Sequence, residues 1–387
     1  MADFDVNDLK TKYEQFNSPI IVVYVNGTKL DPDTSDVLIR RAEVELVSGF
    51  EAAIAEISLV GVFDQKLKAF KTDKIKNFIL LGSTVVLSLG YGTSVREVFR
   101  GFIARVHFVA QDDVPVIQLT CMDIKGNLMA DRHSKRLKSR YYSDAVKEIL
   151  DQNALFKAKD SQGGDFITSV IDDTPDKPKG QGEGGGGESK TDDVRVEMVE
   201  ESDYEFIVKA ARKFNFEFFT VGGNLYFSEA KKNTDILIEL SLGLGLQGLD
   251  VGYDITGLVR KVEVRNVDPD QGDFVGKTMK LKSTISMGNK ASEYVEGQSM
   301  VYIDPTVRNK EEAEYRANYL SEVVNYRLGS IRADAVGLPE LVPGRFITLR
   351  DMGKPVDNTF YLTRVRHTYT LSEFTTVIEG VANNIVK

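Results

Sequence analysis

The chain has 387 residues, a formal net charge of −9, 42% hydrophobic residues and 28% charged residues. This length is enough for two or three domains with a sizeable core, and the composition is typical of globular proteins. No basic stripe offsets the acidic charge, so we do not expect specific binding of nucleic acid through its phosphates.

Cys121 is the only cysteine, which excludes a disulfide within the chain and a cysteine-rich zinc site. It lies in the alternating run VIQLTCMDI, which predicts a small buried side chain. The N-terminal residues do not have the pattern of a secretory signal, and no apolar run approaches the roughly 20 residues that span a bilayer. We therefore expect a protein made in the cytoplasm, with no membrane-spanning segment.

Residues 1–20 form an N-terminal arm, and residues 21–125 read as a series of short strands. Val, Ile, Phe and Tyr alternate with polar residues in PIIVVYVNGTKL, AAIAEISLVGVF and STVVLSLGYG. Asn26-Gly27 predicts a tight hairpin, because a type I′ turn needs positive φ at both central residues. Several short strands without a long helix favour a closed barrel or a sandwich.

Residues 126–235 have a different pattern, which predicts an intermediate α/β segment. SDAVKEILDQNALF has helical spacing, and ESDYEFIVKAARKFNFEFFTVGGNLYF predicts a helix capped by Asp203, then a strand, a turn and a strand. Between them, residues 172–193 are polar and glycine-rich, which predicts a disordered loop. The alternative is an arm that becomes ordered on a partner.

Residues 236–387 again favour strands, with one amphipathic helix at 309–328. This region repeats patterns of the first one. Gly82 to Leu87 and Gly344 to Leu349 share the pattern G-x-x-[VI]-x-L, and GFIARVHF matches FYLTRVRH with Arg105 aligned to Arg364. The repeat predicts two similar β-barrels, 21–125 and 236–387, with the α/β segment between them.

The run LGLGLQGLDVG contains G-x-G-x-x-G at Gly243, Gly245 and Gly248. A dinucleotide site needs a strand before this motif and a helix after it. The residues that follow have a strand pattern, so we do not interpret the motif as a nucleotide site and expect no cofactor.

Three histidines, His107, His133 and His367, have no metal-ligand spacing, and no G-x-S-x-G motif supports a catalytic triad. His107 and His367 fall in the two repeated strands, where a strand residue with a hydrogen bond is the simpler interpretation. Paired carboxylates for sugar cleavage stay open, because Asp and Glu total 58 and any one pair carries little weight. We expect no catalytic residue, no metal site and no enzyme activity.

The run SKRLKSRYY places Lys135, Arg136, Lys138 and Arg140 beside two tyrosines. Such a cluster can contact a nucleic-acid strand. A solvated connector between domains, or a patch that meets an acidic neighbour, is the simpler interpretation.

Three segments together resemble one family, the contractile-tail baseplate hubs: the phage late-control D proteins and the hub part of type VI secretion spike proteins. ESDYEFIVKAARKFNFEFFTVGGNLYF is similar to their Asp-x-x-Phe helix with an aromatic strand, and DITGLVRKVEVRNVDPDQG to a strand ending in Val-x-Val and Asp-Pro. GLPELVPGRFITLRDMGKPVDNTFYLTRVRHTYTLSEFTTVIEGV resembles their last barrel. The resemblance covers residues 203–381 well and 21–123 more loosely.

The resemblance implies a homotrimer, two barrels that line a channel, and no catalysis. Its implied partners are the tail tube, a spike, other baseplate components and, as a further candidate, the tape measure protein. The sequence ends at Lys387, after the second barrel, so we expect the spike to be a separate chain. Three copies with two barrels each present six similar barrels to a sixfold tube and remain threefold toward a spike.

Two other functions stay open: a tail-associated cell-wall hydrolase and a carbohydrate-binding β module. The first predicts clearing of peptidoglycan in a zymogram, and the second a sugar-dependent melting temperature. The motifs are common to phages, phage-tail bacteriocins and extracellular injection systems, so they indicate assembly into such a particle without selecting one or its target cell.

Overall fold

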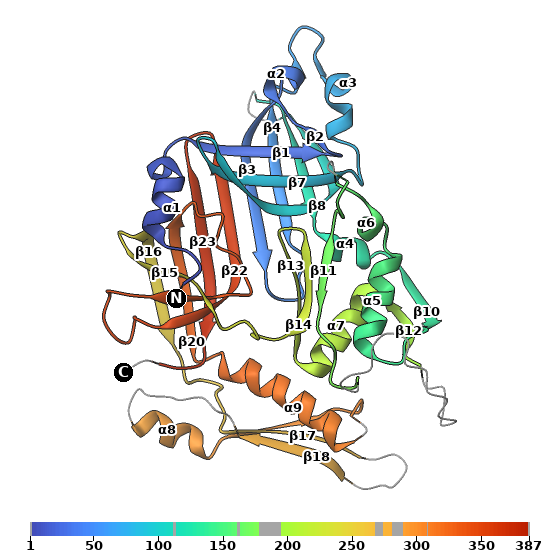
Figure 1. Ribbon diagram of the computed structural model, residues 1–387, viewed down its shortest axis with the longest axis vertical. Helices are drawn as coiled ribbons and strands as arrows, with labels where there is room; N and C mark the ends of the chain where they lie inside the picture. Colours follow the sequence, from blue (N-terminus) through green and yellow to red (C-terminus); the bar gives the residue numbers. More distant parts are fainter. Residues whose placement is uncertain are drawn as a thin grey trace.

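The computed structural model describes residues 2–110, 114–160, 163–177, 195–267, 274–280, 289–307 and 309–385. The chain is mainly β, with its longer helices beside and below the main sheet (Figure 1). The predicted class, mainly β with an α/β insertion, is confirmed. No helix within the described residues is long and apolar enough to cross a membrane.

The first region forms a curved six-stranded sheet in the order β1-β7-β8-β9-β4-β3. Its strands are β1 (Pro19–Val25), β3 (Leu38–Val47), β4 (Ile54–Val60), β7 (Thr84–Tyr91), β8 (Ser94–Val109) and β9 (Val116–Met122). The Asn26-Gly27 turn, with φ of 50° and 75°, brings β2 (Thr28–Lys29) back onto the outer edge of β1. Within the described residues no pairing joins β1 to β3, so this sheet is not closed by hydrogen bonds.

The second region forms a closed six-stranded barrel. Its strands are β15 (Ile236–Leu242), β16 (Gly245–Tyr253), β20 (Gly329–Val336), β21 (Phe346–Leu349), β22 (Thr359–Thr370) and β23 (Phe374–Ala382). The order is β15-β21-β22-β23-β20-β16, and β16 closes the ring by pairing with β15. Burial alternates along these strands, as their sequence pattern predicts.

The two regions are copies of one strand arrangement. When the six long strands of each are counted in chain order, both have the spatial order first, fourth, fifth, sixth, third, second. Their ladder irregularities also fall at equivalent places: Ile39/Arg41 in β3 and Leu246/Gly248 in β16, Ile103/Arg105 in β8 and Leu362/Arg364 in β22. The first strand differs, because β1 is antiparallel to β7 whereas β15 is parallel to β21.

A direct seam joins the two regions. β3 pairs antiparallel with β22, so the strands of both regions form one continuous sheet. Buried side chains of both regions, such as Val44, Val85, Ile238 and Val365, belong to one hydrophobic core. This shared core predicts that the two barrels move as one body.

The α/β segment has a core of its own beside the first region (Figure 1). Its elements are α4 (Ile124–Leu128), β10 (Arg132–Arg136), α5 (Tyr142–Gln152), α6 (Ala154–Lys157), β11 (Thr168–Ile171), β12 (Glu197–Ser202), α7 (Asp203–Phe214), β13 (Phe216–Val221) and β14 (Asn224–Glu229). The predicted cap of α7 is wrong by one residue: Ser202 is the cap. Its hydroxyl accepts from the Glu205 amide, and the Glu205 carboxylate accepts from the Ser202 amide.

A further layer lies below the barrel (Figure 1). It consists of β17 (Lys261–Val267), β18 (Phe274–Lys280), β19 (Ser299–Ile303), α8 (Asn289–Glu296) and α9 (Lys310–Asn325). The sheet order is β18-β17-β19, and α9 packs on it. The sequence placed these residues within the barrel region 236–387, whereas the structure inserts them between β16 and β20.

The N-terminal arm packs on the second barrel. It contains α1 (Val6–Lys12) and a short 3-10 helix, η1 (Glu14–Phe16). Val6 and Leu9 are buried, and Phe4 bridges to Ile238. The link from β4 to β7 forms a hairpin that is the upper tip in Figure 1. The remaining short elements are α2 (Pro32–Ser35), β5 (Phe63–Asp64), β6 (Ala69–Phe70), α3 (Thr72–Ile75) and η2 (Lys76–Phe78).

The start of the glycine-rich segment is anchored, contrary to the expectation of disorder from residue 172. Asp172 binds Lys232, Thr174 is buried, and the Lys177 ammonium lies 2.8 Å from Asp144. Residues 178–193 of the predicted loop lie outside the described residues.

Candidate functional site: the seam between the barrels and the cleft beside it

The seam brings two arginines of the repeated strand onto carboxylates of β3. Arg366 lies opposite Glu45, and its Nη2 is 2.6 Å from a Glu45 oxygen. Arg364 binds the other Glu45 oxygen and also Glu51, at 2.7 Å. The hydrogen bond that Arg366 donates to Glu45 raises the pKa of Arg366 above its usual range. Main-chain pairing and charge therefore hold the two barrels in one register.

His367 follows Arg366 directly in sequence but points to the opposite face of β22. It is fully buried and lies opposite Val44 across the seam. Its Nε2 donates to the Leu341 carbonyl at 3.2 Å, and its Nδ1 accepts from the Thr376 hydroxyl at 2.9 Å. Burial lowers the pKa of His367 from 6.5 to about 4. The ring is thus neutral, and its two hydrogen bonds connect the barrel wall to the loop before β21.

The other two histidines lie on separate elements. His107 is exposed on β8, and His133 on β10 has its Nε2 3.1 Å from an Asp203 oxygen. Cys121 is fully buried on β9, where burial raises its pKa to about 12. Within the described residues no three metal-ligating side chains gather at one point. The structure does not bring these candidate residues together.

The glycine motif forms the tight turn between two strands. Gly243 and Gly245 have φ of 78° and 90°, and β16 follows directly where a nucleotide site needs a helix. The motif therefore serves the turn that closes the second barrel.

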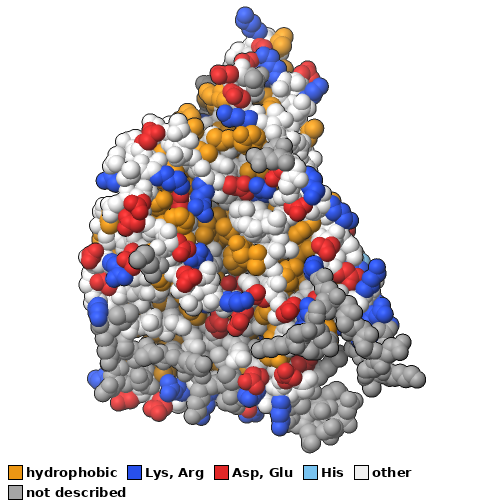
Figure 2. Space-filling model, in the orientation of Figure 1, with side chains coloured by type: hydrophobic (Ala, Val, Ile, Leu, Met, Phe, Trp, Pro, Cys, Tyr) orange, Lys and Arg blue, Asp and Glu red, His pale blue; other side chains and the backbone are white. Residues whose placement is uncertain are grey.

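The basic run faces acidic residues of the same chain. Lys135 lies 3.8 Å from Asp203, and Arg136 lies 3.7 Å from Glu197. The face in Figure 2 also shows Lys and Arg interspersed with Asp and Glu, without a continuous basic stripe. This placement favours the patch that meets an acidic neighbour, here within the α/β segment.

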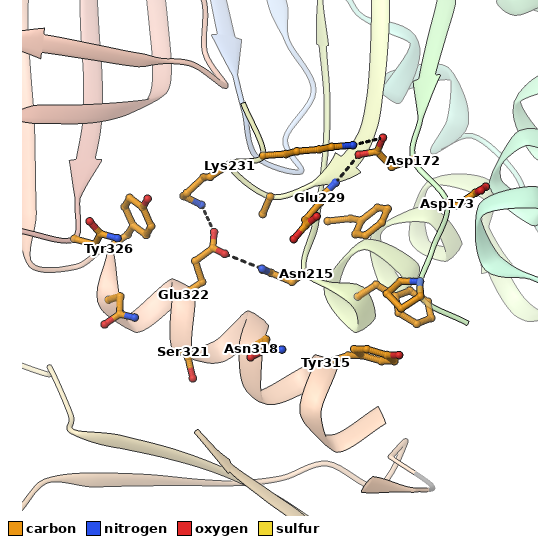
Figure 3. A pocket seen from close by; sticks show the side chains of 17 residues that line it. Asp172, Asp173, Asn215, Glu229, Lys231, Tyr315, Asn318, Ser321, Glu322 and Tyr326 are labelled. Atoms are coloured by element: carbon orange, nitrogen blue, oxygen red, sulfur yellow. Dashed lines mark hydrogen bonds and ion pairs between the residues drawn. The ribbon is translucent and has the colours of Figure 1, made fainter. Parts of the chain in front are cut away.

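A cleft of about 740 Å³ lies where the α/β segment, α9 and the second barrel meet (Figure 3). Lys231 reaches across it, and its ammonium lies 2.6 Å from Glu322 of α9 and 3.6 Å from Glu217 of β13. Glu217 also accepts from the Tyr361 hydroxyl of β22, at 2.5 Å. Burial raises the pKa of Glu217. The network ties three parts of the chain together, with the one ammonium of Lys231 shared between two carboxylates.

A fully buried lysine joins the first region to the α/β segment. Lys125 is fully buried, and its ammonium donates to the carbonyls of Gly49, at 3.2 Å, and of Glu51. The Phe218 carbonyl of β13 lies 3.5 Å away. Desolvation lowers the pKa of Lys125. The sequence offered no signal for this residue, because Lys125 follows a strand like any exposed lysine.

Comparisons with known proteins agree with the architecture. No protein-family model matches the chain, and no curated protein matches it in sequence. In solved structures, the chain is similar to a tail protein from Neisseria meningitidis MC58, with 11% identity, a TM-score of 0.65 and coverage of 95% of this chain and 97% of that one. It is equally similar to the 43 kDa tail protein of prophage MuSo2 from Shewanella oneidensis, with 13% identity, a TM-score of 0.65 and coverage of 95% and 99%.

A third similar structure comes from E. coli. It is described as a component of the type VI secretion system with structural similarity to the bacteriophage T4 tail proteins gp27 and gp5. The identity is 12%, the TM-score 0.55, and the coverage 93% of this chain and 76% of that one. The chain therefore has the fold of phage tail proteins and of a type VI secretion component, as its motifs suggested.

Proposed function

We propose that this chain is the structural hub of a contractile tail or injection machine. Three copies form a ring of six similar barrels around a central channel. One side of the ring meets the sixfold tail tube, and the other holds a threefold spike that is a separate chain. The protein is made in the bacterial cytoplasm and becomes part of a phage tail or phage-tail-like particle, next to other baseplate components.

The observation that carries this proposal is the duplicated six-strand arrangement, whose second copy is a closed barrel. A sixfold ring and a threefold spike cannot make equivalent contacts with one simple trimer. Two barrels with one strand order and matched ladder irregularities give a trimer six near-equivalent units. The β3–β22 seam fixes the two barrels of each chain relative to each other, as an adaptor requires.

The two ends of the molecule differ in a way that fits this role. The layer around α9 lies at the lower end in Figure 1, opposite the hairpin tip, and the α/β segment lies along the right-hand side. These parts occur once per chain, so a trimer presents them with threefold symmetry. We assign the lower end to the spike and the barrel end to the tube.

Symmetry and mass of the assembled complex test this function. Three copies per ring, about 129 kDa from a chain of 43.1 kDa, with six barrels around an open channel, would support the hub. A twofold dimer, or six copies of this chain in one ring, would contradict it. Clearing of peptidoglycan by the purified chain would favour the hydrolase instead.

A further inference from the structure

The internal repeat leaves one contact without a counterpart. β3 is the second long strand of its region, β22 is the fifth of the other, and the two pair across the seam. The equivalent strands are β16, the second of the barrel, and β8, the fifth of the first region. Within the described residues β16 and β8 do not pair with each other.

The edge of β8 that is equivalent to the seam edge of β22 is open. Arg105 pairs with Thr120 of β9, just as Arg364 pairs with Glu379 of β23. On its other side the stretch from Arg364 to Thr370 pairs with β3. The equivalent stretch of β8, from Arg105 to Val109, has no strand on that side in the described part of the chain. Phe108 is 44% exposed there.

β16 has the matching open edge. From Gly248 to Tyr253 it pairs with β20, but β15 reaches only Gly245 and Leu246 on the other side. Among the described residues no strand covers that side after Leu246. β16 lies at the left margin of Figure 1, where another chain can approach. Open strand edges are templates for pairing with another chain.

We propose that β8 of one copy pairs antiparallel with β16 of the next copy, in the register of the β3–β22 seam. This inference rests on the proposed function, because the partner is the neighbouring copy in the ring. The matched ladders set the register: Val106 lies opposite Tyr253, Phe108 opposite Val251, and Val109 opposite Asp250. Three such contacts alternate with three seams and close the ring as one continuous sheet.

The charges of the two edges agree with this pairing. In the seam, cations on the fifth strand face carboxylates on the second, as Arg366 faces Glu45. The open edges also place a cation of β8 opposite a carboxylate of β16, because Arg105 falls opposite Asp254, at the position that Arg364 and Val47 occupy in the seam. Arg105 and Asp254 are both exposed, and neither has an ion pair among the described residues. Opposite charges directly across a strand pair stabilise it, and like charges weaken it.

Cysteine cross-linking in the assembled tail tests the register. Residues directly opposite have Cα atoms about 5 Å apart, within disulfide range, whereas residues two positions along the strand are roughly 7–8 Å away. The test variant combines Val109→Cys with Asp250→Cys. The matched control combines His107→Cys with Asp250→Cys, which is shifted by two residues. Cys121 does not compete, because it is buried and its pKa is raised to about 12.

Mild oxidation should convert the first variant into covalent trimers, with at least tenfold less product from the control. Charge reversal gives an independent readout: Arg105→Glu should weaken ring formation about threefold per edge, and Asp254→Lys in the same chain should restore it. Lys10→Glu, on the exposed face of α1, is the control and should have no effect.

The outcomes separate the two proposals. Covalent trimers from the first variant alone support the β8–β16 pairing. A threefold ring in which this pair does not cross-link, or in which the shifted control links equally well, overturns the pairing and leaves the hub function standing. A particle without three copies of the chain per ring overturns both.

Discussion

Gly82 and Gly344 occupy the same position in the two copies of the strand arrangement. Their φ angles are 80° and 81°. Each amide donates at 2.9 Å to the carbonyl just before the bulge of the fifth strand, Ile103 for Gly82 and Leu362 for Gly344. A repeat that persists in a left-handed glycine and its hydrogen bond indicates a duplicated unit rather than a chance similarity of strands.

The two glycines predict different costs for the same substitution. Gly82→Ala should lower the free energy of unfolding by about 1 kcal/mol. Only the left-handed backbone is strained there, because a Cβ would meet nothing within 4 Å. Gly344→Ala should cost roughly 3 kcal/mol, because its Cβ would lie 2.4 Å from the Phe219 ring. Denaturant unfolding of the two variants measures the difference. Phe219→Leu should recover part of the loss in Gly344→Ala, and equal costs for the two glycines would contradict this account.

His367 predicts a loss of stability in acid. Its pKa is about 4 in the folded chain and 6.5 without burial, so the unfolded chain binds the proton more tightly. The stability from the neutral ring is therefore complete above pH 6.5 and is lost as the pH falls toward 4, by up to about 3 kcal/mol. His367→Gln does not titrate, so its destabilisation relative to wild type should shrink by about this amount between pH 7 and pH 4. A difference that does not change with pH would show that folding leaves the pKa of His367 unchanged.

Local patterns predicted much of the fold. Alternation gave the strands, the Asn26-Gly27 pair gave a hairpin, and the alignment of Arg105 with Arg364 gave the repeat. The layer around α9 was not separated from the barrel, because β17 alternates in the same way as a barrel strand. Periodicity indicates that a strand has one buried face, but not which sheet it joins.

The seam was harder to predict than the strands. Arg364 and Arg366 were conspicuous beside His367, but their partner Glu45 is more than 300 residues away in sequence. With 58 acidic residues in the chain, nothing marked Glu45 as their partner. The charge pairing became visible only when β3 and β22 were placed side by side.

The N-terminal arm should depend on one buried carboxylate. The Tyr13 hydroxyl donates to Glu340 at 2.7 Å, and the Lys12 ammonium lies 2.9 Å from the same oxygen. Burial raises the pKa of Tyr13 well above its usual value, so the hydroxyl stays a donor at any working pH. Tyr13→Phe should cost about 2 kcal/mol, because Glu340 is only 1% exposed and loses a hydrogen bond.

A double-mutant cycle checks this contact. In a Glu340→Gln background, Tyr13→Phe should cost about 1 kcal/mol less than in the wild type, because no buried charge is left short of a donor. Tyr24→Phe is the control, because this tyrosine is 37% exposed on β1. Additive effects of Tyr13→Phe and Glu340→Gln would show that the hydroxyl does not stabilise the carboxylate.

In the cleft network, we expect the cation to contribute more to the stability of the fold than either carboxylate. Lys231 lies between Glu322 and Glu217 and is the ammonium that contacts both. Lys231→Met keeps the length of the side chain but leaves two partly buried carboxylates facing each other, which should cost roughly 3 kcal/mol. Glu217→Gln should cost less than about 1 kcal/mol. Its amide oxygen can still accept from Tyr361, and the raised pKa of Glu217 indicates that its charge is already costly to bury.

Thermal unfolding at pH 7 compares the two variants. Glu217→Gln should also reduce the damage done by Lys231→Met, because it removes one of the two facing charges. If Glu217→Gln is the more damaging change, the cleft is held together by that carboxylate rather than by the lysine that spans it.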